Sequence, residues 1–230
     1  SSDAEETAAN AVQETQGSIE LEDALIEKSG VSDTAVAEEY VIGLPGDPAD
    51  FQPYSSASSG RMYTMPMLYE YLAVSDSTGP DGFVGVIMKD YEQVDELTYR
   101  ITIYDNVYDT NGNHITAEDV VWCYNTCKEI GKTSKIKKMD VMTTVDDYVV
   151  EMKLNSNAVG ALLNLMVGTV PIVSKASYEA SPDGMILTPV GTTGYVLTSY
   201  ESGSSYTFEH NGNYWQSEEL TYASSVANAK

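Results

Sequence analysis

The chain has 230 residues, 42% of them hydrophobic, which is enough to bury a core as one large domain or two small ones. Its formal net charge of −23 argues against nucleic acid and anionic membrane surfaces as partners, because like charges repel. The sequence has no apolar run of the roughly 18 residues that a membrane-spanning helix needs.

Residues 1–39 differ in composition from the rest of the chain. Eleven acidic side chains are opposed there by Lys28 alone, and aromatic residues are absent. Such a segment buries too little apolar surface to offset its chain entropy, so we expect a solvated tether. The chain starts at Ser1, and the residues after it are small, polar and acidic, as is typical of the region behind a removed signal peptide.

The ordered part is expected to begin with a short strand at residues 40–44, ended by Pro45 and Gly46. Two prolines keep the following loop, residues 47–54, extended and irregular. Apolar residues at helical spacing then predict a helix over residues 61–72.

Alternating apolar residues predict a pair of strands at residues 84–88 and 98–104. Thr116 and Asp119 have the spacing of a capping box, in which each side chain bonds the other's backbone amide. This motif predicts a helix that runs to about Ile130 and stops at Gly131.

A hairpin is predicted over residues 138–154, turning at Asp146 and Asp147, and a helix over residues 159–167. The segment 188–215 predicts a further β-hairpin, entered through a loop in which Gly191 or Gly194 has positive φ. Short hairpins mixed with helices indicate an α/β or mixed α+β fold.

Cys123 and Cys127 lie four residues apart in the predicted helix, where a disulfide would strain the helix geometry. We interpret them as small hydrophobic residues. A metal site is not expected, since His114 and His210 are isolated and neither has ligand spacing. Adjacent acid pairs such as Asp146 and Asp147 indicate solvated turns and not catalytic carboxylates.

Seven short motifs follow one another along residues 40–215. They are Gly46-Asp-Pro48 with Phe51-Gln-Pro53, Leu68-Tyr-Glu-Tyr-Leu72, Leu97-Thr-Tyr-Arg100, Thr110-Asn-Gly112 with Ile115-Thr-Ala-Glu-Asp-Val-Val121, Asp146-Asp-Tyr-Val-Val150, Pro171-Ile-Val-Ser-Lys175 with Tyr178-Glu179, and Thr188-Pro-Val-Gly-Thr-Thr-Gly-Tyr195. In this order they resemble the extracellular solute-binding proteins of the peptide/nickel class, family 5, the ligand-capturing components of ABC importers.

The chain departs from the family pattern at three positions. Thr193 stands where the family usually has glycine, Gly194 where it has proline, and Asn111 where it has aspartate. Family members are also longer, and the resemblance covers one lobe only. It therefore implies a periplasmic-binding-protein-like class II fold, with residues 40–230 as the first lobe of a two-lobe clamp and the chain as a fragment or half of that clamp.

We expect the ligand cleft beside the loop that follows the first strand, because open sheets place their clefts at the carboxyl ends of their strands. We expect the ligand-binding residues Asp50, Phe51, Gln52, Tyr54, Arg61, Thr192 and Thr193. Alternatives remain for several of them: Phe51 could be core, Arg61 a surface residue at the start of a helix, and the two threonines could only close their turn.

A clamp of this kind breaks no bond in its ligand, so we expect no enzyme activity and no cofactor. The expected function is capture of short peptides and delivery to an ABC permease; nickel chelates and oligosaccharides are alternatives within the family. A cell-surface peptide sensor or adhesion domain without transport is a second interpretation. The expected location is extracellular, as a lipoprotein of a Gram-positive bacterium held only by a lipid anchor, or periplasmic.

Overall fold

A four-stranded antiparallel sheet forms the centre of the fold, in the order β3-β4-β6-β5. The computed structural model describes residues 41–56, 58–212 and 214–216, so the predicted tether at residues 1–39 lies outside them. The strands are β1 (Ala73–Ser75), β2 (Phe83–Gly85), β3 (Met88–Gln93), β4 (Thr98–Ile103), β5 (Met139–Asp146), β6 (Val149–Leu154), β7 (Tyr195–Glu201) and β8 (Ser205–His210). The helices are α2 (Arg61–Leu68), α3 (Ala117–Ile130), the 3-10 helix η1 (Lys135–Lys138), α4 (Ala161–Met166) and α5 (Lys175–Ala180).

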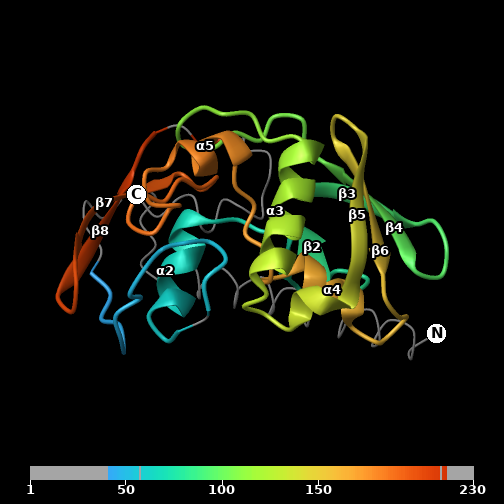
Figure 1. Cartoon of the computed structure of the whole chain (residues 1–230), viewed down its shortest axis with the longest axis horizontal. Coiled ribbons are helices and arrows are strands. Elements are labelled where there is room, and N and C mark those ends of the chain that lie inside the picture. Colours follow the sequence, from blue (N-terminus) through green and yellow to red (C-terminus); the bar gives the residue numbers. More distant parts are fainter. Residues whose placement is uncertain (1–40, 57, 213, 217–230) are drawn as a thin grey trace, which may run out of the picture. The chain divides into compact units, whose positions relative to one another are not determined.

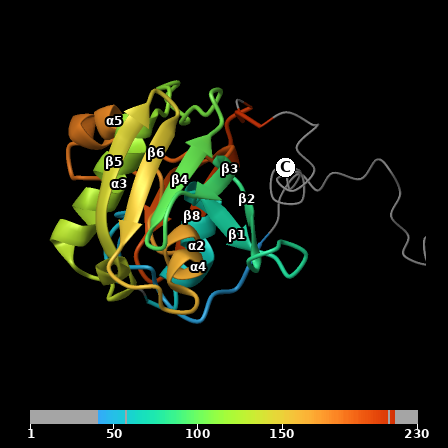
Figure 2. The same ribbon diagram turned by 90° about the vertical axis from the view of Figure 1, so that its right-hand side faces the viewer.

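Helix α3 covers one face of the central sheet, where it packs against β5 and β6 (Figures 1 and 2). The inner strand β6 alternates in burial: Val150, Met152 and Leu154 are buried, and the residues between them are more exposed. This period of two is what a half-buried strand requires. The central sheet and α3 together enclose much of the core.

The start and the end of α3 are confirmed as predicted. The amide of Thr116 donates to a carboxylate oxygen of Asp119 at 2.9 Å, and both halves of the capping box are present. Gly131 adopts a left-handed conformation with φ of 66°, which ends the helix without the steric cost that a Cβ atom would add. The hairpin of β5 and β6 is also confirmed, turning directly after Asp146.

The strand predicted at residues 84–88 is two strands in the structure. β2 pairs with β1, and β3 pairs with β4. The chain changes direction between β2 and β3 because the amides of Val86 and Met88 both donate to the carbonyl oxygen of Leu72, at 2.9 and 3.0 Å.

Two sequence-based expectations about the first elements are wrong. Residues 41–44 form no strand, and Val41 and Ile42 are 82% and 60% exposed, because no described strand lies beside them. The predicted helix over 61–72 ends at Leu68. The backbone after Leu68 is extended because it forms hydrogen bonds with other segments. The carbonyl oxygen of Glu70, for example, accepts the amide of Ile172 at 2.9 Å.

The hairpin of β7 and β8 forms a separate two-stranded sheet beyond α2, away from the central sheet (Figure 1). Its register pairs Tyr195 with His210 and Glu201 with Ser205. Among the described residues, no helix has both the length and the apolar composition needed to cross a membrane.

Candidate ligand-binding site

The loop at residues 47–54 is held in shape by its own side chains. The carboxylate of Asp50 accepts the amide of Gln52 at 3.0 Å, and the side-chain oxygen of Gln52 accepts the amide of Tyr54 at 2.6 Å. Such side-chain bonds to a backbone amide two residues on are typical of turns. The loop is therefore a defined structure that places Asp50, Gln52 and Tyr54 in fixed positions.

Arg61, the first residue of α2, holds this loop in place with three hydrogen bonds. Its Nη1 donates to the carbonyl oxygen and to the carboxylate of Asp50, both at 2.6 Å, and its Nη2 donates to the carbonyl oxygen of Gln52 at 2.5 Å. Arg61 is only 4% exposed, so the alternative of a surface arginine is wrong. A planar guanidinium suits this site because its fork presents several donors in fixed directions.

Phe51 points from the loop into the core and is completely buried, as the core alternative predicted. Its ring meets the rings of Tyr200, Tyr206 and Phe208 edge to face, with centroids 5.3, 6.2 and 6.2 Å away. These contacts attach the loop to the hairpin of β7 and β8. Edge-to-face pairs of this kind add stability beyond the area they bury.

Asp47 makes a second attachment to the same hairpin. Its carboxylate accepts the amide of Ala49 at 2.7 Å, the hydroxyl of Tyr200 at 2.8 Å and the hydroxyl of Ser202 at 3.1 Å, and also the amide of Gly203. The bond from Ala49 and those from the hairpin lower the pKa of Asp47 to about 2. The negative charge therefore persists at any pH near neutrality.

Tyr54 joins the loop to two aromatic residues that the sequence analysis did not assign to the site. Its ring lies 6.3 Å from those of Trp122 in α3 and Tyr178 in α5, which are themselves 5.0 Å apart. The side-chain nitrogen of Gln52 donates to the hydroxyl of Tyr178 at 3.1 Å. Burial raises the pKa of Tyr54, whose hydroxyl donates to the carbonyl oxygen of Pro171 at 3.3 Å.

A signal for Trp122 was present in the sequence. The buried stripe of α3 contains Val120, Cys123, Tyr124 and Cys127 at helical spacing, and Trp122 falls off that stripe. A large aromatic residue beside the stripe indicates a contact with something other than the sheet. Tyr178 gave no comparable signal, because its role depends on where the loop places Gln52.

The side chain of Thr193 joins its turn to the C-terminal end of α2. Its hydroxyl donates to the carbonyl oxygen of Met67 at 2.6 Å, and it approaches that of Leu68 at 3.3 Å. The last carbonyl groups of a helix have no partner within the helix, and this hydroxyl supplies one. Thr192 is 1% exposed and its hydroxyl makes no hydrogen bond of normal geometry.

The expected positive φ at Gly191 or Gly194 is wrong, since neither residue adopts it. The glycines are required for close packing. A Cβ atom on Gly191 would lie 1.7 Å from the carbonyl oxygen of Leu68, and one on Gly194 would lie 2.9 Å from Nε2 of His210.

A second carboxylate, Glu70, binds three side chains of the segment that follows β8. It accepts hydrogen bonds from the hydroxyl of Tyr214, from Nε1 of Trp215 at 2.7 Å and from the side-chain nitrogen of Gln216 at 3.0 Å. Burial raises the pKa of Glu70, and these donors partly oppose that rise.

The structure thus brings five of the seven predicted residues into one assembly, which we call the loop cluster: Asp50, Phe51, Gln52, Tyr54 and Arg61, joined by Trp122 and Tyr178. Phe51, Tyr54 and Arg61 are buried supports, whereas the side chain of Asp50 is 30% exposed. The carboxylate of Asp50 can accept hydrogen bonds, and the partly exposed rings of Trp122 and Tyr178 offer aromatic surface. Among the described residues, no three His, Cys, Asp or Glu are placed to hold a metal ion.

The sequence of residues 82–227 matches the family model described as "Bacterial extracellular solute-binding proteins, family 5 Middle". This match covers more than half of the 230 residues. The chain belongs to this family. Its members are substrate-binding proteins, and the family match confirms the resemblance on which the fold was predicted.

Solved structures of family members share the fold. The oligopeptide-binding protein AppA of Bacillus subtilis, in complex with a nonapeptide, is 21% identical with a TM-score of 0.63, over 74% of this chain and 35% of AppA. NikA of Brucella suis, in complex with Fe(III)-EDTA, is 22% identical with a TM-score of 0.61, over 74% and 36%. A periplasmic oligopeptide-binding protein of Thermotoga maritima with bound mannohexaose is 21% identical with a TM-score of 0.61, over 75% and 33%.

The chain therefore spans about a third of the length of these structures, a partial coverage that fits a single lobe. No curated protein matches the sequence.

Proposed function

We propose that the chain is part of the substrate-binding component of an ABC importer, which captures short peptides and delivers them to a membrane permease. The membership of family 5 supports the transport role. The single observation that carries the choice of a peptide is the loop cluster, because one short loop carries the partly exposed carboxylate of Asp50 and, through Gln52 and Tyr54, contacts the aromatic residues Tyr178 and Trp122. A peptide offers an amino group and apolar side chains to such a surface.

Within this proposal Asp50 is the principal ligand contact. One of its carboxylate oxygens is occupied by Arg61 and by the amide of Gln52, and its side chain remains 30% exposed. The second oxygen can accept an N–H of the ligand. Gln52, Tyr178 and Trp122 complete the surface, while Phe51, Tyr54 and Arg61 keep the loop rigid. Thr192 and Thr193 support the turn beside α2.

Rigid placement favours binding, because a preorganised site loses less conformational entropy when the ligand arrives. Contacts that form only in the closed clamp then shift the open and closed populations. The proposed location is extracellular, with attachment to the membrane through a lipid anchor. We propose no enzymatic step and no cofactor.

Native mass spectrometry of the protein taken from its source cells tests this proposal. We expect a copurified short peptide, and we expect the Asp50→Asn variant to retain less of it than the wild type. Asp140→Asn removes an exposed carboxylate on β5 and is the matched control. A nickel chelate or an oligosaccharide in place of the peptide would change the ligand and keep the transport role.

A cell-surface peptide sensor or adhesion domain is the second candidate, and it makes the same prediction for the bound peptide. Crosslinking in intact source cells separates the two. The transport proposal expects permease subunits among the crosslinked partners and loss of peptide uptake when the gene is deleted. Uptake that persists at the wild-type rate would leave the sensor or adhesion function.

A further inference from the structure

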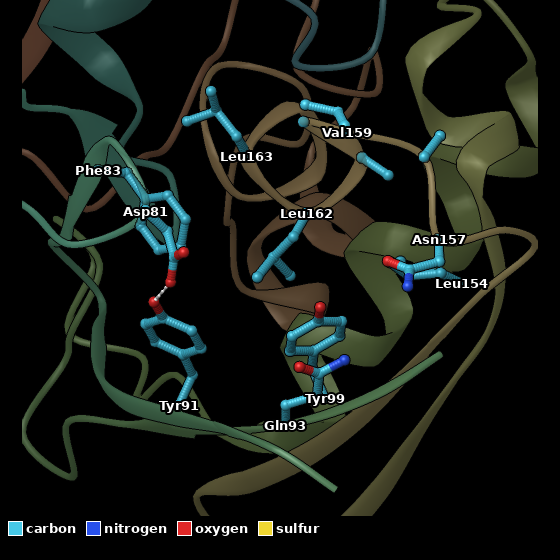
Figure 3. A pocket seen from close by; sticks show the side chains of 13 residues that line it. Asp81, Phe83, Tyr91, Gln93, Tyr99, Leu154, Asn157, Val159, Leu162 and Leu163 are labelled. Atoms are coloured by element: carbon cyan, nitrogen blue, oxygen red, sulfur yellow. Dashed lines mark hydrogen bonds between the residues drawn. The ribbon is translucent and has the colours of Figure 1, made fainter. Parts of the chain in front are cut away.

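A pocket of about 260 Å³ lies on the central sheet, where the chain around α4 crosses β3 and β4 (Figure 3). Its lining residues are Asp81, members of β2, β3 and β4, the last residue of β6, and residues 157–163. None of the residues of the loop cluster lines it. Its volume is below the roughly 300–1,000 Å³ typical of sites for drug-sized ligands, so it suits a small chemical group.

Two tyrosine rings form one wall of the pocket. In the register of β3 and β4, Tyr91 lies opposite Ile101 and Gln93 opposite Tyr99, so the two tyrosines lie diagonally on the same face of the sheet. Figure 3 shows the ring of Tyr99 pointing towards Leu162 and the ring of Tyr91 pointing towards Asp81. The ring of Phe83 packs against that of Tyr91 with centroids 5.3 Å apart.

The only charged side chain that lines the pocket is a carboxylate. Asp81 accepts a hydrogen bond from the hydroxyl of Tyr91 through one of its oxygens. No lysine or arginine is among the lining residues. Burial and the neighbouring Asp81 raise the pKa of Tyr91 to about 12, so the tyrosine stays neutral and keeps donating to the carboxylate.

The other lining residues are Leu154, Asn157, Ala158, Val159, Gly160, Ala161, Leu162 and Leu163. Asn157 is the only one of them whose side chain carries a polar group. The side-chain nitrogen of Gln93 donates one hydrogen bond to the carbonyl oxygen of Glu96 at 3.3 Å. On the wall formed by residues 157–163, a sugar would find a side-chain partner only in the amide of Asn157, and each buried hydroxyl group without a partner costs free energy.

An alkylated ammonium group has the opposite requirements. Its methyl groups need no hydrogen bonds, its positive charge is attracted by aromatic faces, and a carboxylate supplies the counter-charge. The net charge of −23 also concentrates cations near the protein. We propose that this pocket is a second binding site, which takes a small alkylated ammonium group against Tyr91 and Tyr99 with Asp81 as counter-ion.

Isothermal titration calorimetry of the full chain with choline, at low ionic strength, tests this inference. The neutral isostere 3,3-dimethyl-1-butanol is the matched ligand control, and methyl glucoside tests a sugar. We expect saturable binding of choline, and binding of the isostere weaker by at least about fivefold, as expected from the loss of a cation–π contact and a charge pair.

Two variants locate the site. Asp81→Asn removes the charge but leaves an oxygen for the hydroxyl of Tyr91, and Tyr99→Leu removes one ring but keeps apolar volume. Each should weaken choline binding about fivefold or more. Asp140→Asn and Tyr108→Leu alter an exposed carboxylate and an exposed tyrosine outside the pocket and should leave it unchanged. Circular dichroism confirms that each variant is folded.

Three results would overturn the inference: no saturable binding of choline, equal binding of the neutral isostere, or undiminished binding in both pocket variants. Binding of methyl glucoside in place of choline would reassign the pocket to carbohydrate. The inference is independent of the proposed peptide site, because Asp50→Asn should change peptide retention and leave choline binding as it is.

Discussion

Arg61 and Asp50 are joined twice through one nitrogen: Nη1 of Arg61 donates at 2.6 Å both to the carbonyl oxygen and to the carboxylate of Asp50. The first residue of a helix thus holds both the backbone and the side chain of the loop that precedes it. Because Arg61 is buried, the loop and the helix cannot separate without exposing or orphaning these groups.

We predict that Arg61→Ala destabilises the protein by about 3 kcal/mol, since it removes a buried side chain and leaves three oxygen atoms of Asp50 and Gln52 without their hydrogen-bond donor. Urea unfolding followed by circular dichroism measures this difference. Arg100→Ala is the control: Arg100 pairs with Glu92 and Glu151 at 3.2 Å on a side chain that is 39% exposed. Arg100→Ala should lower the free energy of unfolding by no more than about 1 kcal/mol. Equal effects of the two variants would contradict a supporting role for Arg61.

The packing of Gly191 against α2 gives a second prediction. Gly191→Ala would bring a Cβ atom to 1.7 Å from the carbonyl oxygen of Leu68, so the turn must move. We expect a loss of about 2–3 kcal/mol, the size of an overpacking defect, in the same unfolding experiment. Gly43→Ala meets no atom within 4 Å and should change stability little. A stable Gly191→Ala protein would show that the turn tolerates displacement.

The lowered pKa of Asp47 predicts an acid-sensitive attachment between the loop and the hairpin of β7 and β8. The folded-state pKa of about 2 lies below the ordinary value of 3.8, so its stabilising contribution is complete above about pH 4 and is lost as the pH falls towards 2. In Asp47→Asn this contribution should be absent at every pH. Urea midpoints measured between pH 2 and 6 should therefore converge for wild type and variant at the acid end. Curves that stay parallel would rule out titration of Asp47 as the cause.

Both cysteines should be unreactive in the folded protein. Cys123 and Cys127 are free and buried, and burial raises their pKa values to about 12 and 11. Since the thiolate is the reactive form, a thiol reagent at pH 8 should label neither residue until the protein is unfolded. The count of labelled thiols by mass spectrometry, with and without urea, checks this. Rapid labelling of native protein would indicate local opening of α3.

Features determined by neighbouring residues could be predicted from the sequence. The capping box of Thr116 and Asp119, the stop at Gly131 and the hairpin that turns after Asp146 all depend on interactions within a few residues, and the structure confirms them. The motif order also predicted the family correctly, because it combined many weak local patterns.

Features determined by distant partners could not be predicted. The end of α2 at Leu68 depends on the amide of Ile172, which binds the carbonyl oxygen of Glu70 about a hundred residues earlier in the chain. Likewise, the role of Tyr178 depends on where the loop places Gln52 and Tyr54. The close approach of Gly191 to the carbonyl oxygen of Leu68 could not be predicted either, because the sequence gives the glycine but not its neighbour in space.

The contacts of Glu70 have a consequence for how the protein is made. Its three hydrogen-bond donors, Tyr214, Trp215 and Gln216, lie 144 to 146 residues later in the chain. A ribosome adding roughly 5–20 residues per second needs about 7 to 30 s to reach them. Throughout that interval the nascent chain carries Glu70 without these partners, so the region around α2 cannot reach its final form before translation passes Gln216.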